Sequence, residues 1–173
     1  MSVKEALDKY KNSFDSLSQA FVEEYLSYGM TEEEAKSDIQ QRILPGSVVD
    51  RIPTLDAGVY QAASLLLKER FLYAGSWQDI GETFISVNEM AELVDKPHFR
   101  DWVASMRDNW ESSAPAMYPD SRLSLLSVMS QDEGDYTLAV WNNPAEPEIW
   151  RYSGQGEHKF KDLLAWFNWL NGN

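Results

Sequence analysis

YTLAVW at residues 136–141 and EIWRY at residues 148–152 are two short runs that decide the fold. Both are rich in β-branched and aromatic residues, which favour a pleated and half-buried strand. The residues between them, 142–147, read NNPAEP, and this Asn- and Pro-rich composition is typical of a loop. The two runs therefore predict a β-hairpin.

The segments on either side of this hairpin extend it. Residues 123–129 read as a third strand, and QDEG at residues 131–134 predicts the turn that joins it to the hairpin. After Gly154 and Gly156, residues 160–170 read FKDLLAWFNWL, with apolar residues at helical spacing. The C-terminal third therefore predicts a three-stranded meander closed by a packing helix.

The N-terminal segment predicts two helices, each opened by a capping box. Ser2 with Glu5 begins a long helix that ends near Gly29, and one face of this helix stays apolar along its length. The apolar positions are Val3, Ala6, Leu7, Tyr10, Phe14, Leu17, Phe21 and Tyr25. Thr31 with Glu34 begins a second helix, which we expect to run to about residue 42.

The middle of the chain predicts three further helices. Thr54 is the expected N-cap of the first, with apolar residues repeating as far as Phe71. Residues 75–82 read as a loop, and residues 83–85 as a short strand. Ser86 with Glu89 then forms a third capping box, and Pro97 suits the first turn of the next helix.

Helices dominate before Gly75 and strands after Arg122, and this segregation predicts an α+β fold. We expect an antiparallel sheet of about four to six strands flanked by helices, with a helical N-terminal half. The length of 173 residues suits one domain. Within it, residues 1–45 are expected to form a helical extension or first helix pair, and residues 46–173 the α+β core.

The composition narrows the possible functions. The chain has no cysteine, which excludes disulfides, thiolate metal sites and cysteine nucleophiles. Its formal net charge of −13 would repel nucleic acids and anionic membranes, and favours a basic protein as partner. Because no signal-peptide pattern or membrane-spanning apolar stretch is evident, we expect a cytoplasmic protein.

Residues able to carry chemistry are sparse. The two histidines, His98 and His158, lack a second metal ligand at helical spacing. The carboxylate pairs along the chain are best interpreted as solvated surface charge, and no phosphate-binding glycine loop is present. The sequence therefore predicts no catalytic residue, no metal site and no cofactor.

Three motifs resemble those of the SMI1/KNR4 family, also called the SUKH superfamily. They are FISVNEM at residues 84–90, preceded by Gly75 and an acidic irregular stretch, GDYTLAV at residues 134–140, and FKDLLAWF at residues 160–167. The resemblance is to that family's strand and short helix, its penultimate hairpin arm and its closing helix. The first helix pair lies outside these motifs, as an N-terminal extension.

The resemblance implies a protein that binds rather than catalyses. Many bacterial SUKH proteins are similar to immunity proteins that neutralise toxins, often nucleases, and fungal relatives resemble cell-wall regulatory scaffolds. We therefore expect an immunity protein that neutralises a basic toxin domain by stoichiometric binding. The candidate partner contacts are loop or strand-end residues of acidic or aromatic character. They are Trp77, Asp79, Glu82, Asp132, Glu133, Glu146, Glu148 and Trp150.

Two alternatives stay open from the sequence. The first is a carboxylate-based hydrolase, which requires a concave pocket holding two acidic groups whose pKa values are pushed apart. The second is a regulatory or scaffold protein that dimerises through its N-terminal helix pair.

Overall fold

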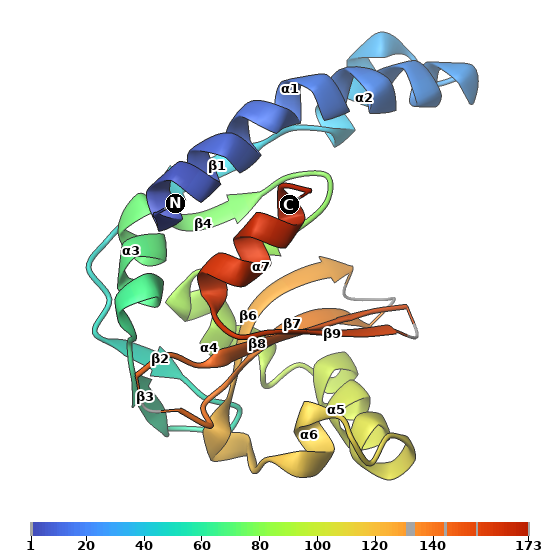
Figure 1. Ribbon diagram of the computed structural model, residues 1–173. Coiled ribbons are helices and arrows are strands. Elements are labelled where there is room, and N and C mark those ends of the chain that lie inside the picture. Colours follow the sequence, from blue (N-terminus) through green and yellow to red (C-terminus); the bar gives the residue numbers. More distant parts are fainter. Residues whose placement is uncertain (1, 131–133, 144, 155, 173) are drawn as a thin grey trace.

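Residues 2–130, 134–143, 145–154 and 156–172 are described by a computed structural model of the chain (Figure 1). Within them, a seven-stranded antiparallel sheet and a separate two-stranded sheet pack against helices. This arrangement confirms the predicted α+β class. The main sheet is larger than the four to six strands expected.

The secondary structure is as follows. The helices are α1 (Val3–Ser27), α2 (Glu32–Asp38), α3 (Leu65–Tyr73), α4 (Val87–Leu93), α5 (Pro97–Asn109), α6 (Ala114–Met117) and α7 (Leu163–Leu170), with a 3-10 turn at Asp120–Arg122. The strands are β1 (Arg42–Pro45), β2 (Arg51–Pro53), β3 (Tyr60–Ala62), β4 (Ala74–Gln78), β5 (Thr83–Phe84), β6 (Leu123–Ser130), β7 (Asp135–Val140), β8 (Glu148–Ser153) and β9 (Gly156–Phe160). The main sheet has the order β1-β4-β5-β6-β7-β8-β9, and β2 pairs with β3.

The C-terminal meander is confirmed and has one strand more than predicted. Strands β7 and β8 pair from Tyr136 opposite Tyr152 to Val140 opposite Glu148. The extra strand is β9, whose sequence GEHKF has a single apolar residue because the strand lies at the sheet edge. The closing helix therefore begins at Leu163 rather than at residue 160.

The three predicted capping boxes are confirmed at the starts of α1, α2 and α4. Helix α2, however, ends at Asp38, and the chain from Arg42 onward becomes β1, which pairs with β4. Residues 42–45 thus belong to the sheet. The first two turns of α1 also belong to the core, since Val3 and Leu7 are buried in it. Both ends of the segment expected as an extension, residues 1–45, therefore contact the rest of the fold.

The segment from Thr54 to Gln78 differs most from the prediction. Thr54 does not cap a helix, because its hydroxyl donates a hydrogen bond of 2.9 Å to the Val59 carbonyl in the β2–β3 turn. Strand pairing holds residues 60–62 extended despite their helical spacing. Helix α3 begins instead after Ser64, and the first half of the expected loop at residues 75–82 belongs to strand β4.

The two faces of the main sheet are covered by different helices (Figure 1). On the face of α7, the ring of Phe84 lies 5.4 Å from Trp166, and α1 and α3 pack beside this helix. On the opposite face, Phe99 and Trp102 of α5 pack around Tyr136, with ring centroids 5.0 and 4.7 Å from it. One continuous apolar core results, because both layers share the strands between them.

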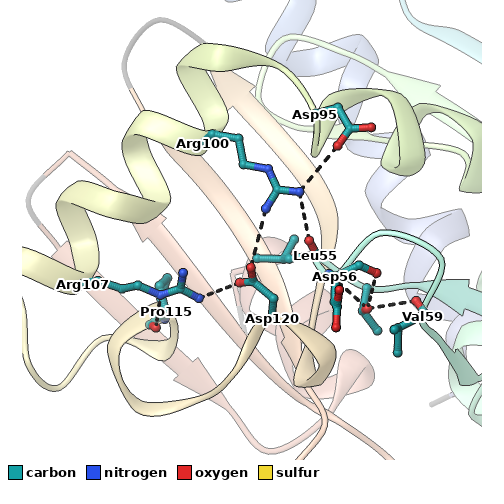
Figure 2. A network of polar contacts seen from close by, with 9 residues as sticks. Leu55, Asp56, Val59, Asp95, Arg100, Arg107, Pro115 and Asp120 are labelled. Carbon is teal, nitrogen blue, oxygen red and sulfur yellow. Dashed lines mark hydrogen bonds and ion pairs between the residues drawn. The ribbon is translucent and has the colours of Figure 1, made fainter.

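Figure 2 shows the polar network that fixes α5 in place. Arg107 donates to the Asp120 carboxylate over 2.6 Å and to the Pro115 carbonyl over 2.9 Å. Arg100 donates to the Leu55 carbonyl over 3.0 Å, and its other terminal nitrogen lies 3.6 Å from Asp120. Two arginines of one helix thus hold the α6–β6 connection and the β2–β3 turn together.

Candidate protein-binding surface

The second half of α1 extends past the edge of the sheet, and α2 packs beside it (Figure 1). We call residues 14–41 the helical arm. From Phe14 to Glu34 no residue of this stretch is fully buried, whereas Ala35 and Ile39 of the α2 segment are. The arm is therefore held together mainly by contacts between its own two helices.

The helical arm is strongly acidic. It carries seven carboxylates and one lysine, a formal net charge of −6. The carboxylates are those of Asp15, Glu23, Glu24, Glu32, Glu33, Glu34 and Asp38. The lysine, Lys36, is paired with Glu32 one turn away, and this pairing lowers the pKa of Glu32. Nearly half of the protein's net charge therefore lies on this arm.

The arm also exposes apolar side chains. Leu17, Leu26 and Tyr28 are 52, 42 and 73% exposed. A cavity of about 690 Å³ between α1 and α2 is lined in part by Phe14, Val22 and Ile39. Apolar anchors within a charged rim are the usual composition of a protein-binding surface.

A second cavity, which we call the basal pocket, lies where α1 passes over the loop between β4 and β5. It has a volume of about 290 Å³. Its lining is largely apolar and comprises Tyr10, Ser13, Phe14, Leu17, Phe21, Asp79, Ile80, Gly81 and Met129. Among the described residues of that lining, Asp79 is the one that carries a charge, and the others are largely apolar.

The Asp79 carboxylate is held in place by three neutral donors. Its Oδ1 accepts hydrogen bonds from the Tyr10 hydroxyl at 3.1 Å and from the backbone N–H groups of Gly81 and Glu82 at 3.0 and 3.2 Å. Partial burial raises the pKa of Asp79, and the two backbone donors oppose that shift. Burial and the nearby Asp79 charge both raise the pKa of Tyr10, so its hydroxyl stays a donor.

Behind Asp79 lies a buried ion pair. The Arg151 Nε is 3.3 Å from the Glu82 carboxylate, which also accepts a hydrogen bond from the Ser127 hydroxyl. Burial raises the pKa of Glu82, while the Arg151 charge acts to lower it. Glu82 and Arg151 thus pair with one another, and among the described residues no cation forms an ion pair with Asp79.

Three of the predicted partner contacts are wrong as surface residues, since Trp77, Glu82 and Trp150 are only 1, 2 and 3% exposed. Trp77 packs against the Tyr10 ring, with centroids 5.5 Å apart, and Glu82 pairs with Arg151. Trp150 lies on the opposite sheet face. Their positions at strand ends and in a loop suggested exposure, but tertiary packing covers all three side chains.

The remaining predicted contacts do not gather at one place. Asp79 lines the basal pocket. Glu146 accepts a hydrogen bond of 3.0 Å from the Leu66 N–H at the start of α3, and Glu148 accepts one of 2.9 Å from the Trp150 indole. Asp132 and Glu133 lie outside the described residues. Among the described candidates, the structure brings Trp77, Asp79 and Glu82 together at one place and Glu148 and Trp150 together at another.

Phe14, Leu17 and Phe21 belong to the apolar face predicted for the first helix, and in the structure they line the basal pocket. The sequence shows this apolar face from Val3 to Tyr25 but has no local signal for the point at which it leaves the core.

The site offers little that resembles catalytic machinery. The pKa values of Asp79 and Glu82 are both raised rather than pushed apart, and Glu82 is closed off by its ion pair. His98 and His158 are exposed. Among the residues that the structure describes, no group of three or more His, Cys, Asp or Glu side chains could hold a metal ion. The arrangement favours recognition of a cation.

Within the described part of the chain, no helix combines the length and the apolar character needed to cross a bilayer.

In comparisons with known proteins, no family model matches the chain, and no curated protein or solved structure matches it either. The similarity to the SMI1/KNR4 family therefore stays a prediction from three sequence motifs.

Proposed function

We propose that this is a cytoplasmic protein-binding protein whose helical arm captures a basic protein partner. The observation that carries the proposal is the coincidence, on one projecting arm, of seven carboxylates with the exposed apolar side chains of Leu17, Leu26 and Tyr28. The carboxylates would steer a cationic partner toward the arm, and the apolar residues would anchor it after contact.

The resemblance to SUKH proteins gives this proposal a more specific form. The partner would be a toxin with a basic surface, and stoichiometric binding of the arm would occlude the toxin's functional site. A specific complex of this kind buries about 1,200–2,000 Å² in total. The helical arm and its base together provide an extended surface for such contact.

A pull-down at low salt from the native source, followed by titration of the purified partner, tests the proposal. We expect a one-to-one complex whose affinity falls as salt rises, because exposed charges are screened. The double variant Leu26→Ser/Tyr28→Ser should weaken binding at least about tenfold, since buried apolar anchors dominate interface energies.

A matched control is available on another surface. Tyr60 and Leu65 are 50 and 68% exposed and lie in β3 and α3, outside the helical arm. The variant Tyr60→Ser/Leu65→Ser removes the same side-chain types and should bind as the wild type does. Equal loss in both double variants, or recovery of no protein partner, would overturn the proposal.

Self-association through the arm, as in the dimerising scaffold alternative, would bring two surfaces of net charge −6 together. Like charges oppose such contact. Sedimentation at several concentrations and at low salt distinguishes the two functions, because the partner-binding proposal predicts a monomer.

A further inference from the structure

We infer that the basal pocket receives one arginine or lysine side chain of the protein partner, with its cation at Asp79 and its aliphatic stem along Leu17 and Met129. This inference rests on the proposed function for the identity of the partner. Binding of a cation in the pocket can be tested on the isolated protein, without the partner.

The lining of the basal pocket favours this occupant. Phe14, Leu17, Phe21 and Ile80 provide apolar walls, and among the described lining residues the charge comes from Asp79. Arginine and lysine match such a site because each has an apolar stem and a charged end. The volume of about 290 Å³ is small for a ligand pocket and suits a single long side chain.

Asp79 also needs a counter-ion that the described residues do not give it. Its three hydrogen-bond donors, the Tyr10 hydroxyl and two backbone N–H groups, are neutral and bond to Oδ1, and the neutral Trp77 indole also acts to lower its pKa. The nearby cation, Arg151, already pairs with Glu82 at 3.3 Å. A partly buried carboxylate whose donors are all neutral gains most from a contact with a cation.

The pocket mouth can be reached by a partner bound to the arm. Leu17 and Met129, on its rim, are both exposed. Phe14 lines both this pocket and the cavity between α1 and α2, so the two sites are continuous along α1. A basic chain lying on the arm would therefore pass directly over the basal pocket.

Nuclear magnetic resonance titration of the isolated protein with Nα-acetyl-arginine methylamide tests the pocket. We expect saturable shifts at the amides of Gly81 and Glu82 and at the Met129 methyl. The citrulline analogue, which has nearly the same shape but no charge, should bind at least about tenfold more weakly, because the charge-assisted hydrogen bond is lost.

Two variants distinguish binding of the arginine probe at Asp79 from attraction by the net negative charge of the arm. Asp79→Asn keeps an acceptor for the three existing donors and should weaken the arginine probe about tenfold. Asp15→Asn removes one exposed charge of the arm and should change affinity less than about twofold, as a screened surface charge does. Leu17→Ala, which leaves Asp79 in place, should also weaken the probe.

The outcomes are distinguishable. Equal binding of the arginine and citrulline probes, or equal losses in Asp79→Asn and Asp15→Asn, would overturn the inference. If the arginine probe binds through Asp79 but no basic protein is captured, the pocket binds a cation as inferred and the proposed function is wrong. If a basic partner binds equally well to wild type and to Asp79→Asn, the proposed binding by the helical arm is supported and the inference about the basal pocket is wrong.

Discussion

The Tyr10 hydroxyl in α1 donates a hydrogen bond of 3.1 Å to Asp79 in the β4–β5 loop, and so joins the base of the helical arm to the main sheet. Tyr10→Phe removes this bond while keeping the ring contacts with Trp77 and Phe84. We expect the free energy of unfolding to fall by about 1 kcal/mol in chemical denaturation.

Tyr28→Phe is the matched control for that measurement. Its hydroxyl also donates to a carboxylate, that of Glu24, but on the exposed surface of the arm. The free energy of unfolding should change by less than about 0.5 kcal/mol, because water replaces such a bond. Equal effects of the two substitutions would contradict a structural role for the Tyr10–Asp79 contact.

The raised pKa of Asp79 predicts a dependence of stability on pH. The folded state holds the Asp79 proton more tightly than the unfolded state, whose carboxyl titrates near its ordinary value of 3.8. The stability of the wild type relative to Asp79→Asn should therefore fall as pH rises from below 3.8 through the raised value, and then become constant. Denaturation of both proteins across the acid range measures this difference. A difference that grows with pH would contradict the assignment.

The same titration should affect recognition in the opposite direction. Asp79 attracts a cation when it is ionised, so affinity for the arginine probe should rise as pH increases through the raised pKa of Asp79. Asp79→Asn should remove that rise. The other titratable groups described near the pocket are Tyr10, Glu82 and Arg151. Because all three are retained in Asp79→Asn, any pH dependence that they cause is present in both proteins and cancels in the comparison.

Features set by neighbouring residues could be predicted from the sequence, whereas features set by residues far apart in the chain could not. The capping boxes at Ser2, Thr31 and Ser86 act within four residues, and all three were predicted correctly. Strand β1 depends on pairing with β4, about thirty residues away, and its short sequence RILP carries no comparable local signal. The end of α2 was therefore placed too late.

The candidate site shows the same limit. Asp79 could be selected as an acidic loop residue, whereas the exposure of Trp77 and Trp150 depends on neighbours distant in sequence. The apolar face of α1 was evident from periodicity. That its second half leaves the core could not be predicted, because it depends on where the sheet ends in space.

The buried pair of Glu82 and Arg151 should be strongly coupled. Glu82→Gln leaves a buried cation unpaired and Arg151→Met leaves a buried carboxylate, so each should cost about 3–5 kcal/mol of unfolding free energy. The double variant should cost less than the sum, with a coupling energy of about 1–3 kcal/mol. Chemical denaturation of the four proteins measures it.

The exposed pair of Lys4 and Asp8 provides the control cycle. Because Lys4 is largely exposed and Asp8 partly so, solvent screens their charges and the coupling should be below about 1 kcal/mol. Similar coupling in the two cycles would contradict the view that burial makes the Glu82–Arg151 pair essential to the sheet.

Asp120 joins Arg100 and Arg107 of α5, as Figure 2 shows, and its side chain is mostly buried. Asp120→Asn keeps the shape but removes the charge from both contacts, and should lower the free energy of unfolding by about 1 kcal/mol. Asp95 contacts the same Arg100 at 3.5 Å but is largely exposed, so Asp95→Asn should change stability by less than about 0.5 kcal/mol. Denaturation of both variants tests this contrast, and equal losses would mean that position in the network does not matter.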